Sequence, residues 1–575
     1  MPFSLRPAFL ALCALVPLAT PLGAETAAGS YLAARAATAA NDYRAAIGLY
    51  DAALDANPGV PELMDGAILA QIGAGNVAKA AELARVFVAA GGKSQQSHLA
   101  IMAEKALAGD FAGIIADGKA GDTASGNGAL FDDLVQAWAE LGSGEMTLAL
   151  ADFDKIAKTP GLEFFGHYNK ALALASAGDF EGAEAILSGK SGVSLQSDRR
   201  GVLARVQVLS QLERNPDAIK LLEKNFGRGQ DPGVDDLIAR LEAGEPLPFD
   251  IVRNATDGLA EVFYMLGAAL SGDADDAYVL LYGRITTRLR PGHVDATLLT
   301  AEQLEKLGQH DLASAVYAEI KADDPAYYIA EIGRAAATRA AGRPEAAIEI
   351  LQALARSHGQ IVTVQNALGD ALRRDERYGE AVKAYDTALS MIPTPTRAQW
   401  ALFYARGICH ERLDHWDLAV ADFRKSLELD PEQPQVLNYL GYSFVEKGEN
   451  LEEALSMIQR AVAARPDAGY ILDSLAWAYY QMGRFDEALQ PMERASLLEP
   501  VDAVVTDHLG DVYWQVGRTR EAEFQWHRAL SFEPAEAEAL RIKAKLAKGL
   551  DAVLADEAAQ VPKATEVTKE SGDGN

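Results

Sequence analysis

The chain has 575 residues, of which 23% are charged and 49% hydrophobic, and its formal net charge at pH 7 is −29. A chain of this length is too long for one ordinary hydrophobic core, so we expect several domains or an array of repeats. Nucleic-acid binding needs a basic face, and no run of Lys and Arg appears, so the sequence argues against a nucleic-acid partner.

Residues 1–24 have the layout of a secretory signal peptide. Arg6 precedes an apolar run at residues 8–19, and we place the cleavage site after Ala24. The run is shorter than the ~20 residues that a transmembrane helix needs, and no other stretch is apolar enough, so we expect an exported protein without an integral membrane span. Cys409 is the one cysteine outside this leader, which excludes an intramolecular disulfide.

Residues 25–228 are predicted to form a degenerate N-terminal array of helical hairpins. Tyr43, Ala46 and Tyr50 lie at helical spacing and Pro58 follows them, so these residues mark a first unit. Later units repeat the pattern of small residues and glycine-containing turns more loosely. We count about six units in this part of the chain.

The periodicity breaks at residues 229–258. The stretches RGQDPGVDD and GEPLP are rich in turn residues, and one short helix is predicted between them at residues 234–243. We interpret this segment as a connector between two arrays.

Residues 259–536 are predicted to form a C-terminal array with a clear period. Its prolines at positions 466, 500 and 534 recur 34 residues apart, which is the mark of a repeat architecture. The best-preserved pair of units occupies residues 469–534. Its aligned positions are Leu475 with Leu509, Ala476 with Gly510, Tyr479 with Tyr513, Gly483 with Gly517, Ala488 with Ala522, Ala495 with Ala529, and Pro500 with Pro534.

Each aligned position has a physical reason. Leu475 and Tyr479 form the inward stripe of a first helix, and Gly483 ends that helix because glycine accepts the left-handed backbone conformation. Ala488 is small, as the crossing of two helix axes at roughly 8–10 Å requires. Pro500 stops the second helix because it lacks a backbone donor. After the last repeat, residues 537–557 are predicted to form one capping helix, and residues 558–575 a disordered tail.

The aligned units resemble the tetratricopeptide repeat family, whose pattern places Leu-Gly, Tyr, Ala, an aromatic residue, Ala and Pro at these spacings. The resemblance implies an all-α, right-handed superhelical solenoid of helix-turn-helix repeats without a sheet. It also implies that the first helices line a concave groove, into which the second, fifth, ninth and twelfth positions of each repeat point. The candidate partner-binding residues are Asn438, Tyr442, Tyr470, Asp473, Trp477, Tyr480, Asp507, Asp511 and Trp514. Gln435 and Val504 also occupy such positions.

Aromatic side chains interleaved with Asp and Asn suit a peptide with apolar anchors and a basic or amide group. Trp477 and Trp514 could instead pack between neighbouring repeats, and the sequence leaves both interpretations open. Family members that clamp a C-terminal carboxylate use Lys, Asn and Arg on this face. Lys is absent from these positions, although Asn366, Arg373 and Arg374 keep that mode open one repeat-pair earlier.

Two stretches mimic catalytic motifs. In a zinc-binding HExxH helix the histidines lie four residues apart, whereas His410 and His415 lie five apart, which separates them by ~140° around a helix. The SGKS at residues 188–191 resembles the end of a phosphate-binding loop, but Glu184 stands where that loop requires glycine. We therefore expect no catalytic residue, no cofactor and no metal site.

The stretches LNYLGYSFVEKGENLEEAL and ILDSLAWAYYQMGRFDEAL resemble exported tetratricopeptide proteins of Gram-negative bacteria, which implies the periplasm as the location. We expect a non-enzymatic scaffold or adaptor that binds a protein or peptide partner in the groove of its C-terminal array, and cell-envelope assembly would suit it. The alternative is a cell-envelope enzyme, or an enzyme subunit, with an unrecognised site near residues 229–258. The sequence leaves open the partner's identity and the oligomeric state.

Overall fold

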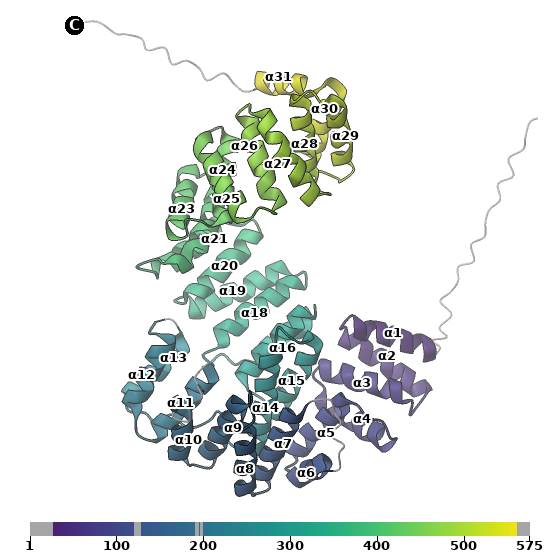
Figure 1. Cartoon of the computed structure of the whole chain (residues 1–575), viewed down its shortest axis with the longest axis vertical. Coiled ribbons are helices and arrows are strands. Elements are labelled where there is room, and N and C mark those ends of the chain that lie inside the picture. Colours follow the sequence, from purple (N-terminus) through teal and green to yellow (C-terminus); the bar gives the residue numbers. More distant parts are fainter. Residues whose placement is uncertain (1–26, 120–127, 190–194, 196–198, 230, 561–575) are drawn as a thin grey trace, which may run out of the picture. The chain divides into compact units, whose positions relative to one another are not determined.

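The computed structural model describes residues 27–119, 128–189, 195, 199–229 and 231–560. Every regular element within these ranges is a helix, which confirms the all-α fold class (Figure 1). The predicted signal peptide at 1–24 lies outside the described residues, as do residues 561–575 of the predicted tail. The helices divide into two compact units, which meet in sequence between Leu354 and Ala355.

The N-terminal unit contains the helices as far as α18, and α19 crosses the division between the units. Their bounds are α1 Ala27–Ala39, α2 Tyr43–Ala56, α3 Pro61–Gly73, α4 Val77–Ala89, α5 Gln95–Leu107, α6 Phe111–Lys119, α7 Ala129–Gly142, α8 Met146–Ala157, α9 Glu163–Ser176, α10 Phe180–Leu187, α11 Arg199–Gln211, α12 Asn215–Phe226, α13 Pro232–Glu242, α14 Ala255–Leu270, α15 Asp276–Leu289, α16 Val294–Lys306, α17 His310–Tyr317, α18 Tyr327–Ala340 and α19 Pro344–His358.

The C-terminal unit contains the remaining helices. Their bounds are α20 Val362–Arg374, α21 Tyr378–Ser390, the short 3-10 helix η1 Arg397–Gln399, α22 Trp400–Arg412, α23 Trp416–Leu429, α24 Pro434–Lys447, α25 Leu451–Ala464, α26 Gly469–Gln481, α27 Phe485–Leu498, α28 Ala503–Gln515, α29 Thr519–Leu530, α30 Glu536–Lys548 and α31 Leu550–Gln560. From α20 to α29, consecutive helices pack as antiparallel hairpins (Figure 1).

Two hairpin turns of the C-terminal unit follow from glycines at equivalent positions of the repeat. Gly483 and Gly517 have φ values of 72° and 82°, in the left-handed region that glycine adopts without strain. The helix crossing expected at Ala488 is tightly packed, since its side chain is fully buried. Sequence signals that act within one repeat therefore set the local geometry of this unit.

The division between the units falls at a different place from the predicted connector at residues 229–258. A short helix, α13, does occur there, but the segment after it packs back onto α11. The Leu247 N–H donates to Ser210 Oγ at 2.9 Å, and the Gln211 side chain donates to the Leu247 carbonyl at 2.6 Å. Because these bonds satisfy the backbone of the segment, residues 229–258 belong to the N-terminal unit instead of separating two units.

The helices α14 and α15 lie against the first helices of the N-terminal hairpins, α3, α5, α7 and α9. Several polar contacts bridge the two sets of helices. They are Arg284 to the Gly73 carbonyl at 3.1 Å, Gln95 to Tyr278 at 2.8 Å, Arg288 to Glu104 at 2.8 Å, the Thr256 hydroxyl to the Ala106 carbonyl at 3.1 Å, and Tyr168 to Glu261 at 3.0 Å. The first-helix side of the N-terminal array is therefore occupied by the chain itself.

Glu261 anchors α14 through a buried ion pair. Its carboxylate accepts hydrogen bonds from Arg200 of α11 at 2.6 and 2.8 Å, and it is 1% exposed. Burial alone would raise the pKa of Glu261, but the Arg200 charge and hydrogen bonds hold that pKa well below its usual range. This pairing fixes α14 against the array, because removal of either partner would leave a buried charge uncompensated.

The predicted single capping helix at residues 537–557 is two helices, α30 and α31. Gly549 separates them with φ 81° and ψ 157°, a backbone conformation outside the helical region. The expectation of one helix was wrong because the apolar periodicity continues on both sides of Gly549 and does not reveal the break that this glycine makes. α31 also extends to Gln560, so residues 558–560 of the predicted tail are helical.

Candidate partner-binding surface

The structure places all nine candidate residues on the first helices of three consecutive hairpins. α24 carries two of them, α26 four and α28 three. The three helices are neighbours, because α26 contacts both α24 and α28. Spacing of one repeat thus brings these side chains onto one face of the C-terminal unit, which we call the first-helix face.

Trp477 is a packing residue within this face. Its ring stacks on Tyr480 at 4.6 Å and on His508 of the next repeat at 3.9 Å. Its indole N–H donates to Glu446 Oε1 at 2.8 Å, and only 7% of the residue is exposed. These contacts correspond to the packing interpretation that the sequence had left open for Trp477.

His508 is a member of this arrangement that the sequence analysis missed. Its Nδ1 lies 2.9 Å from Asp473 Oδ1, and both side chains are buried. Burial alone would lower the pKa of His508, but the carboxylate of Asp473 raises it above its usual value. The contact with Asp473 therefore stabilises the charged form of the imidazole relative to the neutral one. His508 does not occupy any of the four repeat positions that are predicted to face the groove. The one feature of the sequence that could have identified it is that it directly follows Asp507, which does occupy such a position.

The predicted positions in the last repeat are covered by the helices that follow it. The buried ammonium of Lys545, on α30, lies 2.8 Å from Asp507 and 2.6 Å from Asp511. The Trp526 N–H also donates to Asp511, at 2.9 Å. The Trp514 N–H donates to Asp551 of α31 at 3.2 Å. The acidic positions of this repeat are thus neutralised within the chain.

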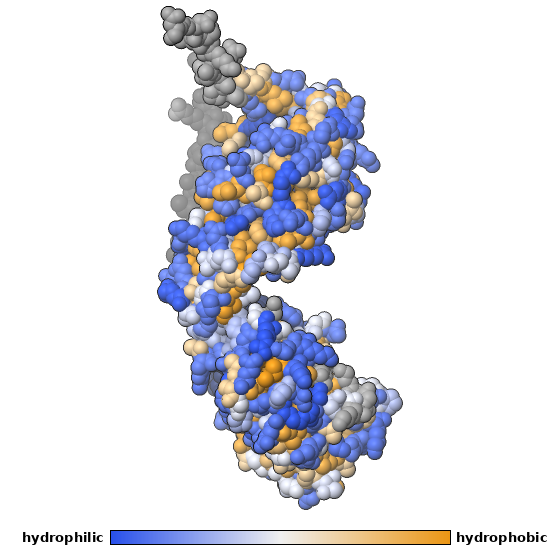
Figure 2. Space-filling view, turned by 90° about the vertical axis from the view of Figure 1, so that its left-hand side faces the viewer, coloured by the Kyte–Doolittle hydropathy of each residue, from blue (hydrophilic) through white to orange (hydrophobic). Residues whose placement is uncertain are grey.

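The second position of each repeat remains open to solvent. Gln435, Tyr470 and Val504 occupy this position in three consecutive repeats, and all three are exposed. Tyr470 is 44% exposed and Val504 40%, whereas Asn438, Asp473 and their equivalents further along the repeat are mostly buried or half-buried. We call these three residues the second-position stripe. The hydrophilic surface of the molecule is interrupted by apolar patches on the face shown in Figure 2.

Asn366 and Arg373, which made binding of a C-terminal carboxylate conceivable, already contact the carboxylate of Asp370. Arg373 Nη2 lies 3.4 Å from Asp370 Oδ1, and the Asn366 amide lies 3.5 Å from Asp370 Oδ2. Arg373 also donates to the Tyr385 hydroxyl at 3.3 Å. Arg374 is exposed. An external carboxylate would therefore have to compete with Asp370 for Asn366 and Arg373.

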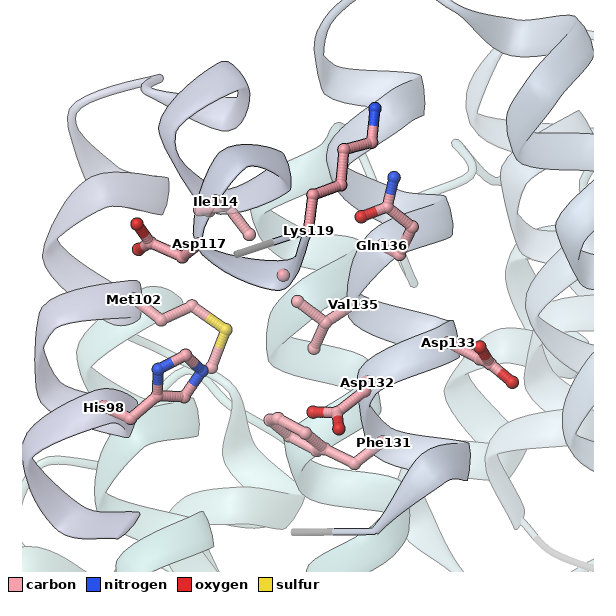
Figure 3. A pocket seen from close by; sticks show the side chains of 11 residues that line it. His98, Met102, Ile114, Asp117, Lys119, Phe131, Asp132, Asp133, Val135 and Gln136 are labelled. Carbon is pink, nitrogen blue, oxygen red and sulfur yellow. The ribbon is translucent and has the colours of Figure 1, made fainter. Parts of the chain in front are cut away.

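The N-terminal unit contains a pocket of about 260 Å³ between α5, α6 and α7 (Figure 3). Met102, Ile114 and Phe131 are apolar residues of its lining, and Asp132 lies beside Phe131. Burial, and then the neighbouring carboxylate of Asp133, raise the pKa of Asp132 to about 6. The pocket can hold a small side chain, but its lining includes the residues that adjoin segment 120–127, which lies outside the described part of the chain.

Within the described ranges of the chain, no group of three or more His, Cys, Asp or Glu side chains is arranged to hold a metal ion. No helix that the structure describes combines the length and the apolar character needed to cross a membrane.

The fold and the first-helix face define a solenoid of helical hairpins. Residues 31–94, 333–398 and 440–497 match one tetratricopeptide repeat family, and residues 400–433 match a second with the same description. A TPR repeat-containing protein of Pseudomonas aeruginosa is 28% identical over 146 residues, which are 25% of this chain and 24% of that protein. The chain thus matches about a quarter of that relative's length.

Two solved structures align over most of the chain. The structure of the APC/C hetero-tetramer Cut9-Hcn1 aligns with 91% of this chain and 96% of its own chain, at 16% identity and a TM-score of 0.38. Yeast Tom70 aligns with 93% of this chain and 97% of its own, at 14% identity and a TM-score of 0.29.

The family matches, together with the helical hairpins, show that this chain contains tetratricopeptide repeats. Proteins built from these repeats generally act as scaffolds for protein–protein interaction.

Proposed function

We propose that this protein is a non-enzymatic periplasmic scaffold that holds a protein or peptide partner on the first-helix face of its C-terminal unit. The observation that carries this proposal is a difference between the two units. In the N-terminal unit the first helices are covered by α14 and α15, whereas in the C-terminal unit the second-position stripe is exposed. An accessible surface on first helices is what a peptide-binding repeat array requires.

The chemistry of the stripe suggests the contact that a partner would make. Tyr470 offers an aromatic ring with a polar hydroxyl, and Val504 one repeat later offers an apolar side chain. Aromatic side chains contribute strongly to interfaces because they bury a large area at low entropic cost. We infer that the partner inserts apolar side chains along this stripe, while the buried Asp473–His508 pair keeps the underlying helices in register.

The periplasmic location rests on the predicted signal peptide at residues 1–24, and a role in cell-envelope assembly rests on that location. The alternative enzyme site near residues 229–258 has no specific support. The polar groups of that segment are used internally, as for Asp250, whose backbone N–H donates to Gln207 at 3.0 Å.

Photo-crosslinking in cells tests the proposal. A photoreactive residue at position 470 reports on the stripe, and positions 447 and 477 serve as controls, because Lys447 is exposed away from it and Trp477 is buried. We expect one dominant adduct from position 470 and none from position 447. Equal adducts at 470 and 447, or none at either, would place the function elsewhere.

A further inference from the structure

α31 begins at a different point of the repeat register from the second helices before it. In the 34-residue register, Gly549 lies two residues before the position that Gly483 and Gly517 occupy in the preceding hairpins. Two residues correspond to a rotation of roughly 200° around a helix axis. A helix that begins immediately after Gly549 therefore starts on the opposite side of α30 from the side where a regular second helix would begin.

The contacts of α31 agree with this direction. The Trp514 N–H donates to Asp551 at 3.2 Å, and Arg541 Nε donates to Glu557 at 2.8 Å. A further ion pair joins Lys548 to Asp556. Trp514, Arg541 and Lys548 all occupy positions that face the predicted groove, either the fifth or the twelfth of their repeat. α31 thus contacts α30 and Trp514, the last residue of the first-helix face.

The hold on α31 is weak for a helix of a solenoid core. Among residues 550–559 of this helix, the buried side chains are Leu550 and Val553, at 0% and 4% exposure. The ionic partners are open to solvent, with 45% of the Glu557 side chain and 62% of the Asp556 side chain exposed, and ion pairs at such exposure contribute little to stability. A single residue, Gly549, connects α31 to α30.

The helix that precedes α31 is rich in cations, in a strongly acidic protein. Four cations lie within α30, namely Arg541, Lys543, Lys545 and Lys548, although the chain as a whole carries a net charge of −29. Lys545 pairs with Asp507 and Asp511. Arg541 is shared between Glu557 of α31 and the same two carboxylates, at 3.4 Å from Asp511 and 3.9 Å from Asp507, whereas Lys548 pairs with Asp556 of α31. The neighbour of these cations is thus an acidic helix with apolar residues on one side.

We propose that α31 is an internal occupant of the partner-binding face, and that the partner's docking element is an acidic amphipathic helix of the same chemistry that displaces it. The proposal rests on the function proposed above and adds the class of partner. The displacing helix must carry carboxylates that pair with Arg541 and Lys548. It must also carry apolar side chains that take the buried positions of Leu550 and Val553.

A peptide with the sequence of residues 549–560 is the probe for the test. A cross-link between the positions of Ala555 and Ala559, which are both exposed, keeps it helical without touching the contact side. The full chain is compared with a variant that carries Asp556→Lys and Glu557→Lys. These exposed substitutions turn two attractive contacts of α31 into repulsive ones and leave the surface beneath unchanged.

We expect the labelled peptide to bind the double variant at least tenfold more tightly than the intact chain, as measured by fluorescence anisotropy. Adding Lys548→Glu to the double variant should abolish that gain, and a control peptide with Asn or Gln in place of its three acidic residues should not bind. Thermal melts by circular dichroism verify that each variant is folded. Hydrogen exchange of the intact chain should be faster in α31 than in α30.

Equal affinity for the intact chain and the double variant, or binding to neither, would overturn the proposal, as would a gain that survives Lys548→Glu. The outcome is separable from that of the crosslinking experiment. Capture of the peptide without cellular adducts from position 470 would refute the proposed function alone. Adducts from position 470 without capture of the peptide would refute only the displacement by an acidic helix.

Discussion

The packing of α14 against α7 of the N-terminal array can be tested by a substitution at Gly258. A Cβ atom added at this residue would lie 2.2 Å from Cε3 of Trp138 on α7. Trp138 has no room to move, since it is fully buried, its N–H donates to Asn169 at 2.8 Å, and its ring packs edge-to-face on Phe153 at 5.6 Å. Gly258→Ala should therefore force α14 away from α7.

The magnitude follows from two opposing effects. Alanine favours a helix over glycine by about 1 kcal/mol. Overpacking a rigid core costs roughly 1–3 kcal/mol, and a ring held on several sides belongs at the upper end of that range. We expect a net loss of about 2 kcal/mol in the free energy of unfolding. Gly48→Ala, in α2, is the matched control, because nothing lies within 4 Å of its added Cβ, and it should stabilise the unit by about 0.5–1 kcal/mol.

Urea denaturation measures the two free energies, and hydrogen exchange with mass spectrometry locates the effect. Protection should fall in α7 and α14 of the Gly258→Ala variant and remain unchanged in α24 and α26. If Gly258→Ala were as stable as the wild type, or behaved like Gly48→Ala, α14 would not lie against α7, and the N-terminal first helices would be free.

Three further predictions concern charge and packing. The pKa of Asp132 is about 6 in the folded protein and about 4 in the unfolded chain, so ionisation of this carboxyl lowers the stability as the pH rises from 4 to 6. Asp132→Asn should therefore raise the free energy of unfolding by about 1 kcal/mol at pH 7 and leave it unchanged below pH ~4, as measured by urea denaturation. Lys545→Met would leave Asp507 and the buried Asp511 with the more distant Arg541 as their cation, which should cost about 3 kcal/mol at neutral pH. The loss should shrink at acidic pH as the carboxylates are protonated, and a pH-independent loss would contradict the pairing. Ala488→Leu should overpack a helix crossing and cost about 1–3 kcal/mol, with the C-terminal unit losing exchange protection before the N-terminal one; a uniform loss would contradict two separate units.

The candidate surface was predictable in position but not in exposure. Repeat spacing is local, so it correctly places Tyr470, Trp477 and Asp507 on neighbouring first helices. Whether a side chain on that face is open depends on its neighbours in the next repeat. His508 covers Trp477, and Lys545 covers Asp507, and neither residue belongs to the pattern that identified the surface.

The sequence by itself determined the hairpins of this protein. Glycines that accept positive φ, such as Gly483, and prolines that stop a helix act on the residues next to them, and small residues such as Ala488 act within one hairpin. Only the tertiary structure decided where the array closes on itself. The contacts of Gly73 with Arg284 and of Glu104 with Arg288 join residues 211 and 184 positions apart. Such contacts depend on the accumulated curvature of many stacked repeats, which no periodicity within a single repeat encodes.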